Sequence, residues 1–260
     1  MTSGNAHSIR ASDGGVAFGI RAWSAWTGDL QSQHDWQAWS ANPHLPPATA
    51  QAPALPEMAA MLRRRLPLLG RVALASVYAC APDDPRPAGM PTVFASRHGD
   101  TARLVTMLTD LAAAEPLSPT AFGLAVHNAI GAVRSIDLAD MNNLQALSAG
   151  RDTVETAVLE ACSLLADGAP EVMLVNYDAP IAGPYAPFAD EPGCLYSWCW
   201  RIATPREGEP WYALTLSNEP AGTPASPLPH GLDVLRFMLS GDARLHHRGE
   251  RASWHWQRHG

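Results

Sequence analysis

Apolar positions along the chain switch between an alternating spacing, typical of strands, and a three-to-four-residue spacing, typical of helices. Apolar segments predict strands at 15–26, 92–95, 171–177, 195–203 and 211–216. Helical spacing predicts helices at 34–40, 57–80, 100–114, 119 onward, 153–165 and 232–239, with Pro67 breaking the second into two. Strands that alternate with helices favour an α/β domain with a layered sheet.

The segment that follows Leu117 begins with a helix-start signal. Ser118 can cap a helix, and Pro119 fits its first turn. Phe122, Val126 and Ile130 recur at helical spacing, so we expect them to share one face of a single helix.

The C-terminal third is expected to add a hairpin and a closing helix to the domain. Its two strands, 195–203 and 211–216, are expected to pair with each other across a polar turn. A proline-rich linker at 219–229 leads to the helix at 232–239. These elements extend the sheet of the main domain.

Three parts are expected along the chain: a flexible N-terminus at 1–14, one domain at 15–240 and a tail at 241–260. The tail is rich in histidine and tryptophan, with His246, His247, Trp254, His255, Trp256 and His259. The histidine spacing matches no ordinary zinc pattern, so a docking tail is favoured over a metal site.

Composition and charge exclude several classes of function. The chain has 260 residues, of which 47% are hydrophobic and 17% charged, so it can bury a real core. Its net charge is -7, which argues against general nucleic-acid binding. All 18 basic residues are arginine, so no lysine can serve as a base, nucleophile or Schiff-base former.

The four cysteines, Cys80, Cys162, Cys194 and Cys199, form no C-x-x-C pair. No zinc site is therefore predicted, and nothing in the sequence indicates another metal or a cofactor. The start of the chain has no leader pattern, and no apolar run is long enough to span a membrane. We expect a protein of the reducing cytoplasm, without a membrane partner.

The turn before the helix at 153–165 is the candidate site for chemistry, after an irregular run that follows Met141. Its sequence, Ala-Leu-Ser-Ala-Gly, is one residue away from G-x-S-x-G, the elbow of α/β-hydrolases. Ser148 could form a triad with His127 and an acid such as Asp178. This alternative predicts a serine acyl hydrolase or acyltransferase.

Three segments, in order, resemble the N-terminal half of β-ketoacyl synthases. The first is the strand and small-residue turn at 93–100, and the second is Leu-Ser-Pro-Thr-Ala-Phe followed by Val-His-Asn-Ala within 117–129. The third, at 148–175, resembles the family's nucleophile turn, buried helix and following strand. With Asp-Ala-Pro at 178–180, the series is most similar to the chain-length-factor-like subgroup of aryl polyene clusters, over roughly residues 15–180.

This resemblance implies a thiolase-like α/β half, a mixed sheet flanked by helices, truncated relative to a full ketosynthase. Counted back from Gly168, the family's reactive cysteine falls at about Arg151, whose guanidinium cannot attack a thioester. The residues after 180 are too few to supply the family's second half, which holds the histidines that drive decarboxylation. The resemblance therefore implies a pseudoenzyme without catalytic residues.

Arg151 has other interpretations, and so do the remaining candidates. It could bind a partner's carboxylate or the phosphopantetheine of an acyl carrier protein, or it could be the salt-bridged start of a helix. The run at 63–65, three arginines, could meet an acidic carrier protein or could be a solvated face. His127 and Asn128 are interpreted as structural residues of a helix, and His98 with Asp100 as part of a hydrogen-bonded turn.

Three functions remain open. The first is a non-catalytic partner that pairs with a full-length ketosynthase as a heterodimer in polyene, polyketide or fatty acid biosynthesis, with an acyl carrier protein as a further partner. The second is the serine hydrolase or acyltransferase that uses Ser148. The third is a homodimeric module that binds acyl chains or carrier proteins.

Overall fold

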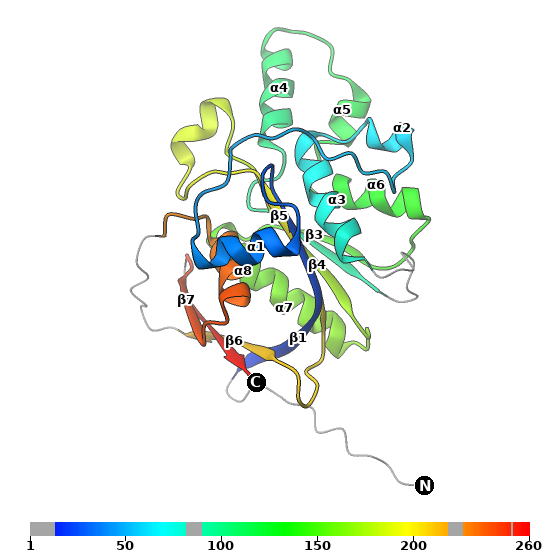
Figure 1. Cartoon of the computed structure of the whole chain (residues 1–260). Coiled ribbons are helices and arrows are strands. Elements are labelled where there is room, and N and C mark those ends of the chain that lie inside the picture. The colour runs from blue at the N-terminus through cyan, green and yellow to red at the C-terminus, as the bar shows by residue number, and fades with distance from the viewer. Residues whose placement is uncertain (1–13, 82–89, 218–225, 251) are drawn as a thin grey trace.

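The computed structural model describes residues 14–81, 90–217, 226–250 and 252–260 (Figure 1). The expected N-terminal segment before Gly14 and most of the expected linker at 219–229 lie outside these residues. In the described part of the chain, eight strands form one sheet in the order β3-β2-β4-β5-β1-β6-β8-β7. The strands are β1 (Gly15–Trp26), β2 (Thr92–Ala95), β3 (Leu144–Leu147), β4 (Val172–Asp178), β5 (Tyr196–Ala203), β6 (Trp211–Ser217), β7 (Arg244–Arg248) and β8 (Ser253–His259).

The sheet is mixed, as predicted. β2 pairs in parallel with β3 and with β4, whereas the remaining pairings are antiparallel. The five strands expected from the sequence are confirmed to within one residue at each end. β3, β7 and β8 were not expected as strands.

Helices cover both faces of the sheet. α1, α7 and α8 pack on one face, and α3 and α6 pack on the other (Figure 1). α4 and α5 lie at the top of the view, beyond the strand ends. The helices are α1 (Gln33–Ala41), α2 (Ala60–Arg63), α3 (Leu68–Cys80), α4 (Thr101–Ala112), α5 (Pro119–Gly123), α6 (Ala129–Leu138), α7 (Thr153–Ala166) and α8 (His230–Ser240), with short 3₁₀ turns η1 (Gly150–Asp152) and η2 (Gly183–Phe188).

The break expected at Pro67 is confirmed, because α2 ends before it and α3 begins directly after it. The single helix expected after Pro119 is wrong: the chain forms α5 and α6, separated by a turn. Gly123, a poor helix residue, ends α5. As a result Phe122 and Val126 are exposed, while Ile130 is buried in the first turn of α6.

The pairing expected between the strands now labelled β5 and β6 is also wrong. β1 lies between them and pairs antiparallel with both. Twelve residues long, β1 contributes its first part to β6 and its last part to β5, with a bulge at Arg21. The chain does close with a hairpin, but β7 and β8 form it.

The expected C-terminal tail is therefore ordered sheet. β8 pairs with β6 on one side and with β7 on the other. Trp254 and Trp256 are buried against the core rather than free to dock. Buried Trp254 and Trp256 alternate with the less buried His255 and Gln257, which is the spacing of a strand. This strand was missed because the prediction considered only the histidine and tryptophan content of the segment.

Two hydrophobic clusters, one on each face, hold the sheet between its helices. One gathers Phe18, Trp198 and Trp200 under α1, α7 and α8, and the indole rings of the two tryptophans stack at 4.4 Å. The other packs α3 and α6 against residues such as Phe94 and Val175. All residues of β2 and β4 are buried, as parallel strands covered on both faces require.

Candidate functional site

Polar side chains gather where the three parallel strands end. β2 runs into Ser96 and Arg97, β3 into Ser148, and β4 ends at Asp178. The Ser96 hydroxyl donates to Asp178 Oδ1 at 2.8 Å, and the Arg97 amide donates to the same oxygen at 3.0 Å. The carboxyl ends of parallel strands are where α/β folds place their ligand sites.

Asp178 is the buried acid of this edge. Burial raises its pKa to about 7, although the hydrogen bond from Ser96 and the charge of Arg97 work in the opposite direction. Its carboxyl group therefore titrates near neutral pH. In the expected triad Asp178 would bond to His127. Instead, His127 Nε2 lies 2.9 Å from the Leu147 carbonyl oxygen.

The turn between β3 and α7 is a strand–turn–helix unit. Gly150 adopts a left-handed φ of 57°, which glycine accepts at little cost. Thr153 fixes the turn, since its hydroxyl donates to the Gly150 carbonyl at 2.8 Å and accepts from the Ala149 amide at 3.0 Å. Ser148 donates its hydroxyl to the Arg97 carbonyl at 2.6 Å.

The three members of the proposed triad are consequently not brought together. The hydroxyl of Ser148, the ring of His127 and the carboxyl of Asp178 each bond to other groups in the described part of the chain. The irregular run expected before Ser148 is wrong, because β3 precedes it. β3 has only four residues, all half-buried, so it carries no alternating pattern that the sequence could reveal.

Arg151 lies in this turn with its side chain about half exposed and ion-paired. Its Nε is 2.8 Å from Asp190 Oδ2. Arg97 bonds the other Asp190 oxygen at 2.8 Å and Glu191 at 2.7 Å. Burial opposes ionisation of Asp190, but its bonds to Arg151 and Arg97 lower its pKa overall. Two arginines and two carboxylates thus tie the turn to the loop before β5.

A second polar cluster lies beneath this turn. Glu155, fully buried on α7, accepts from His230 Nε2 at 2.6 Å and from Trp256 Nε1 at 2.9 Å. The His230 ring stacks on His247, with ring centroids 3.4 Å apart and planes 15° apart. His247 Nε2 donates to the Arg151 carbonyl oxygen at 2.8 Å. The cluster therefore connects α7, α8 and the β7–β8 hairpin to the turn.

Charge is arranged within the cluster as a buried ion pair beside a neutral ring. Burial opposes charge on both partners, yet Glu155 raises the pKa of His230 and His230 lowers the pKa of Glu155. Burial, and then the His230 cation, lower the pKa of His247. These shifts favour the charged form of His230 and the neutral form of His247.

These three side chains are also the ones that could hold a metal ion, because their ligand atoms lie within 4.8 Å of one another. In the described structure, His230 Nε2 and His247 Nε2 are already engaged, the first with Glu155 and the second with the Arg151 carbonyl. Sequence reasoning missed Glu155 and His230. A signal was present, since Glu155 shares a helix face with the buried Val158 and Cys162, and a carboxylate there needs a partner.

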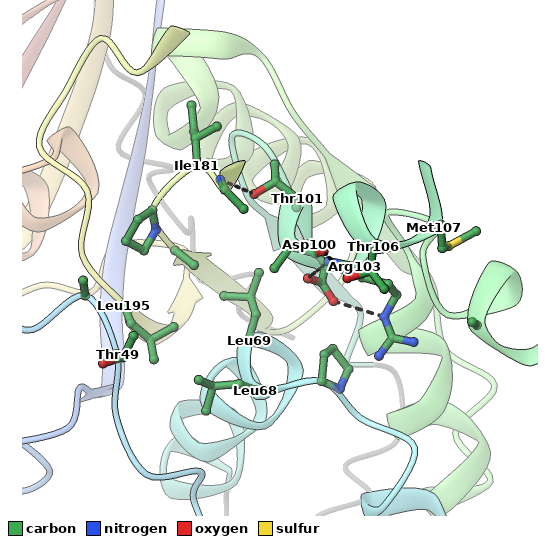
Figure 2. Close-up of a pocket in the computed structure, with 18 of the residues that line it drawn as sticks. Thr49, Leu68, Leu69, Asp100, Thr101, Arg103, Thr106, Met107, Ile181 and Leu195 are labelled. Carbon is green, nitrogen blue, oxygen red and sulfur yellow. Dashed lines mark hydrogen bonds and ion pairs between the residues drawn. The ribbon is translucent and has the colours of Figure 1, made fainter. Parts of the chain in front are cut away.

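An apolar pocket opens beside the same edge of the sheet (Figure 2). Its volume is about 680 Å³, a size typical of small-molecule sites. Leu68 and Leu69 come from the start of α3, Met107 from α4, Ile181 from the loop after β4, and Leu195 from the residue before β5. The pocket adjoins the site because α4 and this loop follow β2 and β4 directly.

The polar groups of the pocket lie along α4. Asp100 caps that helix by accepting from the Arg103 amide at 3.0 Å, and its other oxygen lies 3.2 Å from Arg103 Nε (Figure 2). Thr101 Oγ1 accepts from the Ala182 amide at 3.3 Å, which ties the loop after β4 to the helix. His98 precedes this cap in the turn that was expected there.

The other candidates from the sequence lie away from the site. Arg63 donates to the Leu55 carbonyl at 2.7 Å, while Arg64 and Arg65 are exposed at the end of α2. Asn128 precedes α6 without a side-chain cap bond. No described helix is long and apolar enough to cross a membrane.

The mixed sheet, its two helix layers and the strand–turn–helix at the carboxyl edge define an α/β protein of the ketosynthase type. The family model described as beta-ketoacyl synthase, N-terminal domain, matches residues 36–257, and the chain belongs to this family. The match reaches well beyond residue 180, where the resemblance in the sequence was expected to end, and it includes β7 and most of β8. No curated protein sequence matches the chain.

Solved structures share the fold. One is a chain of the ketosynthase ApeO in complex with its chain length factor ApeC from Xenorhabdus doucetiae, with 24% identity, a TM-score of 0.78, and 93% of this chain and 99% of that chain covered. The ishigamide ketosynthase/chain length factor has 14% identity and a TM-score of 0.59, with 76% of this chain and 65% of that chain covered. A type II polyketide acyl-carrier protein in complex with its ketosynthase has 9% identity and a TM-score of 0.59, with 78% of this chain and 70% of that chain covered.

Proposed function

We propose that this chain is a non-catalytic, chain-length-factor-like partner that pairs with a full-length β-ketoacyl synthase and stabilises it in polyene or fatty-acid-type biosynthesis. The observation that carries the proposal is the turn between β3 and α7, where the family resemblance puts the reactive cysteine at Arg151. Its guanidinium is ion-paired with Asp190. All four cysteines of the chain are buried elsewhere. A guanidinium cannot form the acyl-enzyme.

The similar structures support the choice of partner. Two of them name a ketosynthase together with a chain length factor, and one names a ketosynthase with an acyl carrier protein. We infer a heterodimer with a ketosynthase, with an acyl carrier protein as a second, transient partner.

The outer side of α4 is the surface we assign to the ketosynthase. Leu104, Leu108 and Leu111 recur at helical spacing there and are 43%, 41% and 58% exposed. Two further apolar residues, Phe122 on α5 and Val126 in the turn after it, are 61% and 48% exposed. Exposed apolar side chains that recur on one side of a helix are typical of a protein contact.

The inner side of α4 faces the apolar pocket, and we infer that the pocket receives part of the growing acyl chain. Its walls are mostly aliphatic, and it includes Gly99 and Asp100, which follow β2 at the end of the sheet where the β3–α7 turn also lies. Its depth would then limit chain length by steric exclusion. Thr106→Phe, which projects into the pocket without altering the leucine stripe, is expected to shorten the product of the complex, as measured by mass spectrometry.

Co-expression with the ketosynthase encoded beside this gene tests the proposal. We expect a stable one-to-one complex by size exclusion, with ketosynthase solubility or activity dependent on this chain. Leu108→Glu should abolish the complex, whereas Thr109→Glu should leave it intact. Both changes add the same charge to neighbouring exposed positions, but Thr109 lies on a different side of α4 from the leucine stripe.

Other outcomes identify the alternatives. A folded chain that elutes alone, or as a dimer of itself, in the presence of the ketosynthase contradicts the proposal; the dimer would indicate the homodimeric module. Covalent labelling by a fluorophosphonate, lost in Ser148→Ala, would indicate the serine hydrolase or acyltransferase. Arg151→Cys is expected to gain no condensing activity, because a thiol alone does not supply the decarboxylation step.

A further inference from the structure

A second pocket lies at the opposite end of strand β4 from the candidate site. Its volume is about 600 Å³. Glu171, which precedes β4, lines it, whereas Asp178 at the other end of β4 belongs to the candidate site. The length of this strand separates the two, so the second pocket has its own chemistry.

The second pocket is lined by an excess of positive charge. Its walls carry four arginines and two glutamates: Arg21, Arg201, Arg206, Arg258, Glu171 and Glu209. Four positive and two negative side chains leave a net charge of +2, in a chain whose net charge is -7. A concave surface of one sign concentrates ions of the opposite sign.

The glutamates are already engaged. Glu171 Oε2 lies 2.8 Å from two nitrogens of Arg201. Glu209 is shared, because one oxygen pairs with Arg21 and the other lies 3.9 Å from Arg206. These pairs leave about one positive charge unmatched around Glu209.

Arg258 supplies the second unmatched charge. It is half-buried on β8 and makes no side-chain hydrogen bond or ion pair with any residue that the structure describes. Arg21 is the extra residue of the β1 bulge, and its side chain is only 9% exposed, with a buried Nε that lacks a partner in the described chain. Bulges commonly aim a side chain into a functional site.

We propose that this pocket binds a small phosphate monoester. A phosphate dianion matches the net charge of the lining side chains, and the forked guanidinium groups of arginine suit its oxygens. Ile20, Pro210 and Met238 form an apolar part of the wall, which can cover an organic group attached to the phosphate. The volume is sufficient for such a molecule.

Isothermal titration of the full chain with glycerol 3-phosphate tests this proposal. We expect one saturable site, with affinity reduced about tenfold in Arg258→Gln, which removes one charge-assisted contact. Arg206→Gln, at an exposed position that the fold does not need, should weaken binding as well. Arg244→Gln, which removes an exposed arginine of β7 outside the pocket, should not.

Two further ligands identify the chemistry that is recognised. Succinate, a dianion without phosphate, and inorganic phosphate, without an organic group, should both bind more weakly than glycerol 3-phosphate. If succinate binds as tightly as glycerol 3-phosphate, the site is not selective for phosphate. If inorganic phosphate binds as tightly, the site does not recognise the organic group of a monoester. Absence of saturable binding, or an equal loss in Arg244→Gln, would overturn the site itself. None of these outcomes depends on a ketosynthase partner.

Discussion

The β3–β2–β4 end of the sheet has helices on both faces, and each of the seven residues of β4 is buried. At the β7 end, residues alternate: His247 is buried, while Arg244, His246 and Arg248 are exposed. The first end is stabilised by burying apolar surface. The second buries less and is attached by hydrogen bonds to α7 and the turn before it, from His247, Trp254 and Trp256.

In this molecule one region of the sheet places the candidate site, and another region supports it. The parallel strands bring Ser148, Asp178 and Arg151 to one edge of the sheet. The hairpin, about a hundred residues later in the chain, then holds the Arg151 carbonyl. Variants that test these two contributions separately are expected to differ in how much unfolding free energy they lose and in how that loss depends on pH.

The largest effect is expected from His230→Leu. It leaves the fully buried Glu155 carboxylate without its ion-pair partner, which should lower the free energy of unfolding by about 3–5 kcal/mol. Urea denaturation measures the change. The double variant Glu155→Leu/His230→Leu removes both charges and should lose clearly less than the single variant; an equal loss would mean that packing, not charge, holds the cluster.

Apolar burial should dominate at the parallel end. Leu174→Ala, in the centre of β4 and fully buried, is expected to cost about 2–5 kcal/mol of unfolding free energy. Leu245→Ala, half-buried in β7, should cost less than half as much. Equal losses in thermal and urea unfolding would show that the two ends depend on apolar burial to the same degree.

Asp178 gives the parallel end a dependence on pH. Its pKa is raised from 3.8 to about 7 in the folded chain, so its contribution is fully present below about pH 4 and is lost as pH rises to about 7. Over that range this group lowers stability by up to about 1.4 kcal/mol per pH unit. Asp178→Asn should remove this part of the pH dependence in denaturation series at several pH values, and an unchanged slope would contradict the shifted pKa.

A smaller effect is expected from the hairpin's indole contacts. Trp254→Phe removes the bond from Nε1 to Asp152, 2.8 Å long, and should cost about 1–2 kcal/mol. Trp211→Phe is the matched control, because Trp211 stacks on His259 and its indole nitrogen has no partner among the described residues. Similar losses in the two variants would indicate lost ring packing instead of the hydrogen bond.

The smallest effect is expected from Arg151→Ala. Its ion pair with Asp190 is about half exposed on the arginine side and screened by solvent, so less than about 1 kcal/mol should be lost. Added salt should reduce the difference from the unchanged protein further. A loss of several kcal/mol in urea denaturation would mean that Arg151 supports the turn through more than this pair.

Local patterns predicted most of the fold. α7 and β4 were found because their apolar spacing lies within each segment, and the break at Pro67 follows from the missing amide of proline. The position of β1 between β5 and β6 could not be found this way. Pairings such as Gly19 with Ala203 join residues far apart in sequence, and periodicity contains no information about which strands meet.

The candidate site was predicted only in part. The turn around Ser148 and Arg151 was located from the helix that follows it, and the family of the chain was predicted from motifs in a fixed order. The ion-pair partner of Arg151 could not be predicted, since Asp190 lies in a loop without periodic spacing. Glu155 and His230 are 75 positions apart, so their pairing becomes visible only after the chain has folded.

The place of β1 also has a consequence for synthesis on the ribosome. β1 emerges first, yet its neighbours β5 and β6 emerge only after residues 196 and 211. The unit from β2 to β4, whose contacts are closer in sequence, can begin to fold earlier. Until β5 and β6 arrive, both edges of β1 stay unpaired, and an unpaired strand edge is a template for pairing with another chain.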